Sequence, residues 1–145
     1  MDLLIINGPN INLLGLREPE IYGSDSYEDL LNILSDYADE KKHNISVYQS
    51  NHEGEIVDLI QSEYLSYDAL IINPAAYTHT SIAIRDAIVA VGIDTVEVHI
   101  SDVNNREDFR KVNYYSDIVL KTISNEGIKG YISAIRFLEG RLNDN

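Results

Sequence analysis

The stretch DALIINPAAYTHTSIAIRDAIVAVG, residues 68–92, decides the fold. Its first part, 68–74, holds the apolar run ALII and stops at Pro74, which is typical of a buried strand because proline cannot continue a strand ladder. A segment of helical periodicity follows over 80–92 and ends at Gly92, as expected of the glycine after a helix. A strand followed closely by a helix predicts half of a β-α-β unit, in which helices cover a parallel sheet.

The same alternation continues on both sides of this stretch. Strand patterns occur at 3–7, 45–50, 95–101 and 117–124, and helix patterns at 26–42, 54–66 and 127–142. Five strands joined by helices favour right-handed crossovers and a sheet covered on both faces. We therefore expect one α/β domain over residues 1–145, with a single doubly wound, five-stranded parallel sheet in the order 2-1-3-4-5.

The helix predicted at 80–92 has hardly any polar face. A helix that is apolar most of the way round is usually buried on more than one side. In a chain of only 145 residues, the second side is expected to pack against another subunit.

Composition limits the class of protein. With 145 residues, 44% of them apolar, the chain can bury a core without disulfides. It has no cysteine, which excludes disulfide frameworks and thiolate zinc sites, and its four histidines lack ligand spacing, so we expect no dedicated metal site. The opening run MDLLIINGPN has no basic segment and is too short to span a membrane. A cytoplasmic enzyme or binding protein is the default expectation.

The net charge of −13 argues against nucleic acid or an anionic membrane as a partner, because the chain offers no basic stripe. An anionic ligand would have to be held by local cations. The segment NREDFR, 105–110, brings Arg106 and Arg110 over the carboxyl end of the sheet. Alternatively, Glu107 and Asp108 pair with these arginines on an ordinary surface turn.

Polar residues follow three neighbouring strands of the predicted sheet at their carboxyl ends, where open parallel sheets bind ligands. They are Asn7, Asn10, Asn73, His79, Glu97, His99 and Ser101. Each has a structural alternative: Asn-Gly-Pro-Asn is a common turn, Asn73 before a proline can end a strand, and His79 can cap the next helix. Because the residues coincide at adjacent strand ends, we expect one binding crevice there.

Glu97, His99 and Ser101 are spaced by two, so on a strand they point to the same face. A carboxylate beside an imidazole holds its tautomer and stabilises its protonated form, which equips His99 to act as a general acid. The alternative is a buried Glu-His pair with a structural role.

The segment LGLREPEIYGS, residues 14–24, leaves the first strand over the same crevice and has no periodicity of its own. Such a loop is typical of a lid, and Gly15 and Gly23 allow it to open and close. Tyr22 could act as a base, although its ionisation at neutral pH opposes a pKa near 10, roughly 3 units or about 4 kcal/mol. Close guanidinium groups in a poorly hydrated pocket could supply that energy, and Arg17 and Arg106 are suited to it.

Asp86 lies seven residues after His79 in the predicted helix. Seven residues of helix rise about 10 Å. Asp86 is therefore carried away from its own crevice, and either serves the site of a neighbouring subunit or is an ordinary exposed aspartate.

Together these residues resemble the type II 3-dehydroquinate dehydratases (3-dehydroquinases). The resemblance covers nearly the whole chain and rests on four motifs: INGPNINLLGLREPEIYG (6–23), QSNHEGEIVDLI (49–60), DALIINPAAYTHTSIAIRDA (68–87) and VEVHISDVNNREDFR (96–110). The first and third motifs are long and specific.

The resemblance implies that 3-dehydroquinate loses water in an anti elimination through an enolate. Tyr22 corresponds to the family's base, and Arg17 to the lid arginine that supports it. His99 corresponds to the acid that protonates the departing hydroxyl, with Glu97 behind it. Asn10 corresponds to the residue that helps stabilise the enolate through a water.

The resemblance also implies a substrate cradle, a fold and an assembly. The cradle positions are Asn73, His79, Ile100, Ser101 and Arg110. Asp86 corresponds to a residue that reaches the site from an adjacent subunit. The family has a flavodoxin-like fold, assembles as a dodecamer of trimers and uses no cofactor.

The chain departs from the usual family pattern at Asp102, Asn104 and Asn113, and Asp102 adds negative charge near a site for an anion. Three other readings of the sequence stay open: a dehydratase with a lysine Schiff base, a non-enzymatic flavodoxin-like module such as a receiver or flavin carrier, and an inactive family member. No lysine is expected at the central strand ends, and Asn73-Pro74 stands where a receiver needs an acceptor aspartate.

Overall fold

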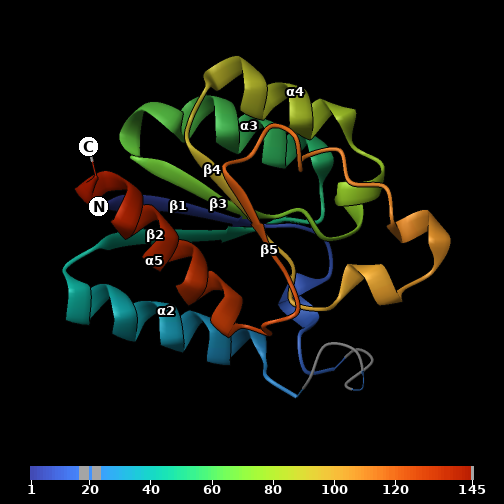
Figure 1. The fold of residues 1–145 in the computed structure, drawn as a ribbon, viewed down its shortest axis with the longest axis horizontal. Coiled ribbons are helices and arrows are strands. Elements are labelled where there is room, and N and C mark those ends of the chain that lie inside the picture. The colour runs from blue at the N-terminus through green and yellow to red at the C-terminus, as the bar shows by residue number, and fades with distance from the viewer. Residues whose placement is uncertain (17–19, 21–23, 145) are drawn as a thin grey trace.

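A computed structural model of the chain describes residues 1–16, 20 and 24–144. The predicted lid residues Arg17 and Tyr22 lie outside the described residues. Figure 1 shows a central sheet between two layers of helices, with α3 and α4 on one face and α2 and α5 on the other. In chain order the elements are β1 (Asp2–Asn7), α2 (Tyr27–Lys41), β2 (Asn44–Gln49), α3 (Glu53–Glu63), β3 (Ala69–Asn73), α4 (Ile82–Val91), β4 (Thr95–Val98), β5 (Lys121–Ile123) and α5 (Lys129–Asn143).

The five strands pair only in parallel, in the order β2-β1-β3-β4-β5, as predicted. The sheet is of the doubly wound, flavodoxin-like kind, with helices on both faces. Helices α2, α3 and α4 join the first four strands, whereas β4 and β5 are joined by a segment that contains two short 3-10 turns. In this order β1, β3 and β4 lie side by side. The register places Asn7 of β1 directly opposite Asn73 of β3, so both strands end at the same level.

The sheet is buried on both faces, so its central strands have apolar residues in succession. Side chains of one parity, such as Leu3 and Ile71, pack with the helices α2 and α5. Those of the other parity, such as Leu4 and Ile72, pack with α3 and α4. The two cores fix the height and the tilt of each strand, and with them the positions of the residues at the strand ends.

Helix α4 begins and ends where the sequence indicates. The Ser81 hydroxyl accepts a hydrogen bond from the amide N–H of Ile84, which caps the start of the helix. Gly92 follows the end with a φ of 67°, in the left-handed region. The alternative prediction that His79 caps this helix is therefore wrong.

Two predicted strands are shorter in the structure. β4 ends at Val98 instead of continuing to residue 101, and β5 covers Lys121–Ile123 instead of 117–124. Residues 115–119 instead form a turn in which the amides of Ile118 and Val119 donate to the carbonyl oxygen of Tyr115. The apolar run there packs beside α4 and does not extend the sheet.

The first polar loop and the loop after β3 approach each other at Gly8. The Gly8 amide donates to the carbonyl oxygen of Asn73 at 2.8 Å. A Cβ atom at Gly8 would lie 2.4 Å from the carbonyl oxygen of Pro74, which is backbone and cannot rotate away. Only glycine allows the two loops to approach this closely.

We therefore predict that Gly8→Ala lowers the free energy of unfolding by about 1 to 3 kcal/mol, because one of the two loops must move. Urea denaturation of the whole chain at fixed protein concentration measures this. Gly54→Ala is the matched control, since its Cβ would meet no atom within 4 Å on exposed helix α3. That variant should be neutral or slightly stabilising. Equal stability of the two variants would contradict the close approach.

Candidate active site

A cavity opens at the carboxyl ends of β1, β3 and β4. It is lined by eight of the predicted site residues: Asn10, Asn73, His79, His99, Ile100, Ser101, Arg106 and Arg110. Glu97 lies behind His99 and is fully buried. These residues come from three strand ends and the loops that follow them, as expected of an open parallel sheet.

A buried hydrogen-bond bridge joins the ends of β1 and β3 at Asn73, which lines the cavity. The Tyr131 hydroxyl of α5 donates to Asn7 Oδ1 at 2.5 Å and accepts from Asn73 Nδ2 at 2.9 Å. Asn73 Oδ1 in turn accepts from the amide N–H of Ala75, so its side chain is held at both ends. Burial raises the pKa of Tyr131, so its hydroxyl stays neutral and acts only as a bridge.

Sequence analysis did not identify Tyr131, which is separated from Asn73 by 58 residues and from Asn7 by 124. Its only signal is a tyrosine on the buried face of a predicted helix, where a hydroxyl needs a partner. The proposed alternative that Asn73 merely ends a strand does not account for these contacts.

The Glu97 carboxylate and the His99 imidazole form a buried pair at the end of β4. Glu97 Oε1 lies 3.3 Å from His99 Nε2, and the two side chains are 0% and 5% exposed. Asn113 Nδ2 and Thr122 Oγ1 donate to the same carboxylate oxygen at 2.8 and 3.0 Å. Burial raises the pKa of Glu97, but the imidazole and the two donors outweigh this effect and hold the pKa below its ordinary value. Glu97 is therefore an anion that lies directly beside the His99 ring.

His79 presents a defined tautomer. Its Nδ1 lies 2.6 Å from the carbonyl oxygen of Val112, which can only accept, so Nδ1 carries the proton and donates it. Burial lowers the pKa of His79 in spite of this hydrogen bond. The ring is therefore neutral near pH 7, and its Nε2 is an acceptor that suits a ligand hydroxyl.

Two arginines line the cavity, and Glu107 pairs with both. Arg110 Nε donates to Glu107 Oε2 at 2.7 Å, and Arg106 Nε lies 3.7 Å from the same oxygen. Asp108 pairs instead with Lys111 at 2.9 Å. The surface pairing that the sequence left open is thus present. Two guanidinium groups thus lie close to one carboxylate, and both arginines line the cavity.

The loop after β4 offers further donors. No group among the described residues accepts a hydrogen bond from the amide N–H of Ile100 or Ser101, and both residues line the cavity. Asp102, which follows them, uses its carboxylate on its own turn: it accepts from the amide of Asn104 and the side chain of Asn105 at 3.1 and 2.6 Å. Its charge therefore serves as a cap, and Asp102 is not among the lining residues.

Asp86 is exposed on α4 and does not line the cavity of its own chain. The inner face of α4 packs on the core through Ile84 and Ile88. Its outer face leaves Ile82 and Val89 more than half exposed, at 52% and 56%. The apolar second face expected from the sequence is thus open in the single chain.

Within residues 1–16, 20 and 24–144, no group of three or more His, Cys, Asp or Glu is arranged to hold a metal ion. In the same part of the chain, no helix is long and apolar enough to cross a membrane.

A doubly wound parallel sheet, with a polar cavity at the ends of its central strands, defines a flavodoxin-like α/β protein with a small-molecule site. Known proteins narrow this class. The model of the dehydroquinase class II family matches residues 1–139. A 3-dehydroquinate dehydratase from Prochlorococcus marinus (strain MIT 9215) is 50% identical over 99% of this chain and 97% of its own length.

Two further relatives agree. A catabolic 3-dehydroquinase from Talaromyces marneffei is 51% identical over 92% of this chain and 77% of its own length. The crystal structure of a type II dehydroquinase from Butyrivibrio crossotus superposes with a TM-score of 0.93 at 49% identity, covering 96% of this chain and 97% of that one. The chain belongs to the class II dehydroquinase family and is an enzyme of the hydro-lyase type.

We predict that Tyr131→Phe costs about 1 to 3 kcal/mol of folding free energy, because it leaves one polar atom of Asn7 and one of Asn73 buried without a partner. Tyr37→Phe is the control: its hydroxyl bonds to Glu139, which is partly exposed and can bind water instead. That variant should cost less than about 1 kcal/mol. Urea denaturation measures the free energy of unfolding of both variants. Equal losses of stability would show that the Tyr131 bridge contributes no more than an ordinary partly exposed hydrogen bond.

Proposed function

We propose that the chain is a 3-dehydroquinate dehydratase of the shikimate pathway, which converts 3-dehydroquinate to 3-dehydroshikimate by anti elimination of water through an enolate. The observation that carries this proposal is the buried Glu97–His99 pair, which lies on a cavity with cations at its mouth. The names of the relatives agree with it.

In this mechanism His99 is the general acid. The hydroxyl group leaves with the electrons of its carbon–oxygen bond, and His99 protonates it so that it departs as water. The position of Glu97 supports this role, because its ionised, buried carboxylate lies beside the ring that would deliver the proton. Since the ring lines the cavity, a ligand can reach it.

The base is proposed to be Tyr22, which takes the proton from the carbon next to the ketone and leaves the negative charge on the ketone oxygen as an enolate. Arg17 lowers the cost of the tyrosinate by its positive charge, and the loop 14–24 closes over the site. Asn10, which lines the cavity, is proposed to help stabilise the enolate oxygen through a water. Tyr22 and Arg17 lie outside the described residues, so their roles rest on the sequence.

The substrate carboxylate is proposed to bind at the loop after β4. The free amide N–H groups of Ile100 and Ser101 and the nearby guanidinium of Arg110 are suited to an anion. The neutral His79 can accept a hydrogen bond from a substrate hydroxyl, and Asn73 is held in a fixed orientation for another. Arg106 adds positive charge at the mouth of the cavity. No cofactor is required, since both proton transfers use side chains.

The test is to add 3-dehydroquinate to the purified protein and follow the ultraviolet absorbance of the conjugated enone product. We expect turnover by the wild type and a loss of about 100-fold or more in kcat for Tyr22→Phe, since that variant lacks the base. Binding of the substrate, measured by calorimetry, should change little because the ring is kept.

Near-normal turnover by Tyr22→Phe would remove Tyr22 from the mechanism. If borohydride and substrate labelled a lysine covalently, a Schiff-base reaction would replace the enolate. A folded wild-type protein without turnover would favour an inactive family member.

We also propose that the chain forms a homo-oligomer, with trimers that assemble into a dodecamer, and that Asp86 reaches the site of a neighbouring subunit. The open outer face of α4, with Ile82 and Val89 exposed, supports a contact there. Asp86 lies on this face and away from its own cavity.

Val89→Glu should therefore lower the molecular mass found by analytical ultracentrifugation, because it buries a charge in the proposed contact. Ser35→Glu, which adds the same charge on the exposed side of α2, should leave the mass unchanged. If Val89→Glu kept the wild-type mass, the contact would not involve this face of α4.

A further inference from the structure

Glu97 needs more than burial to support an acid, because an unheld carboxylate in a low-dielectric site is costly and can turn away from its partner. We propose that Asn113 and Thr122 are positioning residues: their two donors hold Glu97 Oε1 against His99 and keep the carboxylate ionised. This inference rests on the proposed function of His99 and adds two residues to it.

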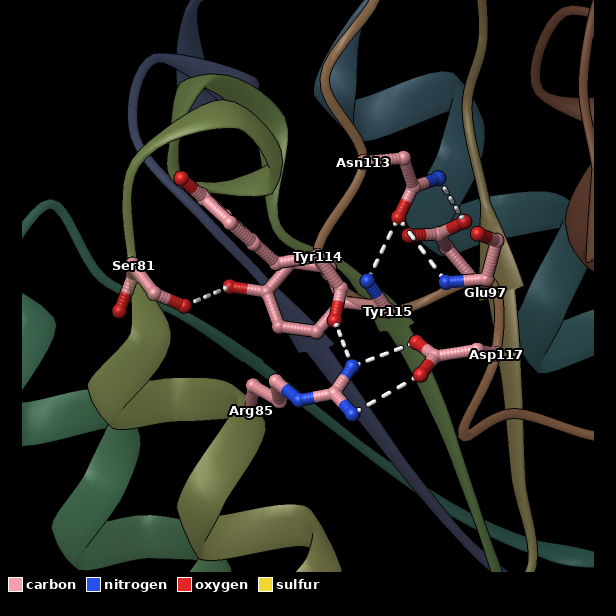
Figure 2. Close-up of polar contacts among 8 residues, drawn as sticks. Ser81, Arg85, Glu97, Asn113, Tyr114, Tyr115 and Asp117 are labelled. Carbon is pink, nitrogen blue, oxygen red and sulfur yellow. Dashed lines mark hydrogen bonds and ion pairs between the residues drawn. The ribbon is translucent and has the colours of Figure 1, made fainter.

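Asn113 acts at both ends of its side chain. Its Nδ2 donates to Glu97 Oε1 at 2.8 Å, and its Oδ1 accepts from the amides of Tyr115 and Ser116 at 2.7 and 3.0 Å. Figure 2 shows the amide of Asn113 between the Glu97 carboxylate and the backbone of the turn that follows. The two acceptor contacts fix which end of the amide faces Glu97, so a donor is always presented to the carboxylate.

Thr122 of β5 donates to the same oxygen. The register of β4 and β5 places Thr122 directly beside Glu97, and paired residues of parallel strands point to the same face. Its Oγ1 donates to Glu97 Oε1 at 3.0 Å. Thr122 Oγ1 and Asn113 Nδ2 thus donate to one carboxylate oxygen, and His99 Nε2 lies 3.3 Å from the same oxygen without forming a hydrogen bond. Glu97 Oε2 has no hydrogen-bond partner among the described residues.

Because only one oxygen of the Glu97 carboxylate is hydrogen-bonded within the described part of the chain, the orientation of the carboxylate is fixed. Rotating the carboxylate away from His99 would break both donor contacts to the fully buried Glu97, which is unfavourable because that carboxylate would lose its two hydrogen bonds. The donors also favour the anion over the neutral acid, since a protonated carboxyl accepts hydrogen bonds less well. Asn113 and Thr122 therefore act on the acid through Glu97 and need not touch the substrate.

The turn that carries Asn113 is anchored independently on α4. Arg85 donates to the carbonyl oxygen of Tyr114 at 2.6 Å and forms an ion pair with Asp117, and the Tyr115 hydroxyl donates to the carbonyl oxygen of Ser81 at 2.9 Å (Figure 2). The turn can thus be weakened without removing a donor from Glu97. This separates a role in holding Glu97 from a role in holding the turn.

The test compares kcat and KM of four variants of the whole chain. Thr122→Val removes one donor with little change of shape, and Thr122→Ser restores it. Asn113→Asp keeps the acceptor for the turn but replaces the donor by a second carboxylate. Asp117→Asn is the control, since it weakens the ion pair with Arg85 and leaves both donors in place.

We expect about a 10-fold fall in kcat for Thr122→Val and Asn113→Asp, with KM within about threefold, as expected when an interaction specific to the transition state is lost. Thr122→Ser and Asp117→Asn should keep at least half of the wild-type kcat. The deficit of Asn113→Asp should grow as the pH rises, because the introduced carboxyl can donate only while it is protonated, and two adjacent carboxylates resist ionising together.

A second measurement does not depend on turnover. Carboxyl ¹³C NMR, with the Glu97 signal assigned by Glu97→Gln, follows the pKa of this group in each variant. Since each donor lowers that pKa, Thr122→Val should raise it by about half a unit or more, and Asp117→Asn should leave it unchanged. If Thr122→Val left both kcat and the Glu97 pKa unchanged, the inference would be wrong.

The kinetic measurement and the NMR titration together distinguish a failure of this inference from a failure of the proposed function. If the wild type did not act on 3-dehydroquinate, the proposed function would fail, and the NMR titration would still decide whether the donors hold Glu97. If the wild type were active and only Asp117→Asn lowered kcat, the turn would matter for its shape and not for Glu97, which would overturn the inference.

Discussion

The site depends on the register between β1 and β3, which sets Asn7 opposite Asn73 at the end of both strands. The Tyr131 hydroxyl joins the two amides, so α5 is tied to the same point as the strands. The close approach at Gly8 brings the first polar loop onto the second. A slip in this register would leave buried amides unpaired and would turn the strand side chains to the wrong face, so the fold and the site are specified together.

Electrostatics explains how a chain with a net charge of −13 can present a site for an anion. The negative charges closest to the site are occupied locally: Asp102 caps its own turn, Glu107 pairs with the two arginines, and Glu97 lies beneath His99. Among the described residues, the cavity is lined by the free amide N–H groups after β4 and by the guanidiniums of Arg106 and Arg110. Because screening limits the reach of exposed charges to about 10 Å, the rest of the acidic surface matters little there.

The sequence predicts most features of the site that depend on where the strands end. Strand order, the crevice and the contact of Glu97 with His99 follow from alternation and from a spacing of two. It does not predict contacts between distant segments, and so it misses Tyr131 and the link from Asn113 to Glu97. Residues 117–124 look like a full strand because their run is apolar, yet only Lys121–Ile123 pair in the sheet, and Ile118 and Val119 pack against the core on the α3 and α4 side. An apolar pattern in the sequence predicts that a segment is buried, but it does not predict which other segment packs against it.

Helix α4 contributes both to the support of the site and to the exposed apolar face, because its adjacent residues Arg85 and Asp86 lie on different faces of the helix. Arg85 points inward to the turn that carries Asn113, while Asp86 lies on the outer face beside exposed Ile82 and Val89. At its start, the carbonyl oxygen of Ser81 receives the Tyr115 hydroxyl from the same turn. A helix of ten residues thus anchors the turn that carries Asn113 on one face and leaves apolar side chains exposed on the other. Such a helix must be apolar nearly all round, which is the unusual pattern that the sequence shows.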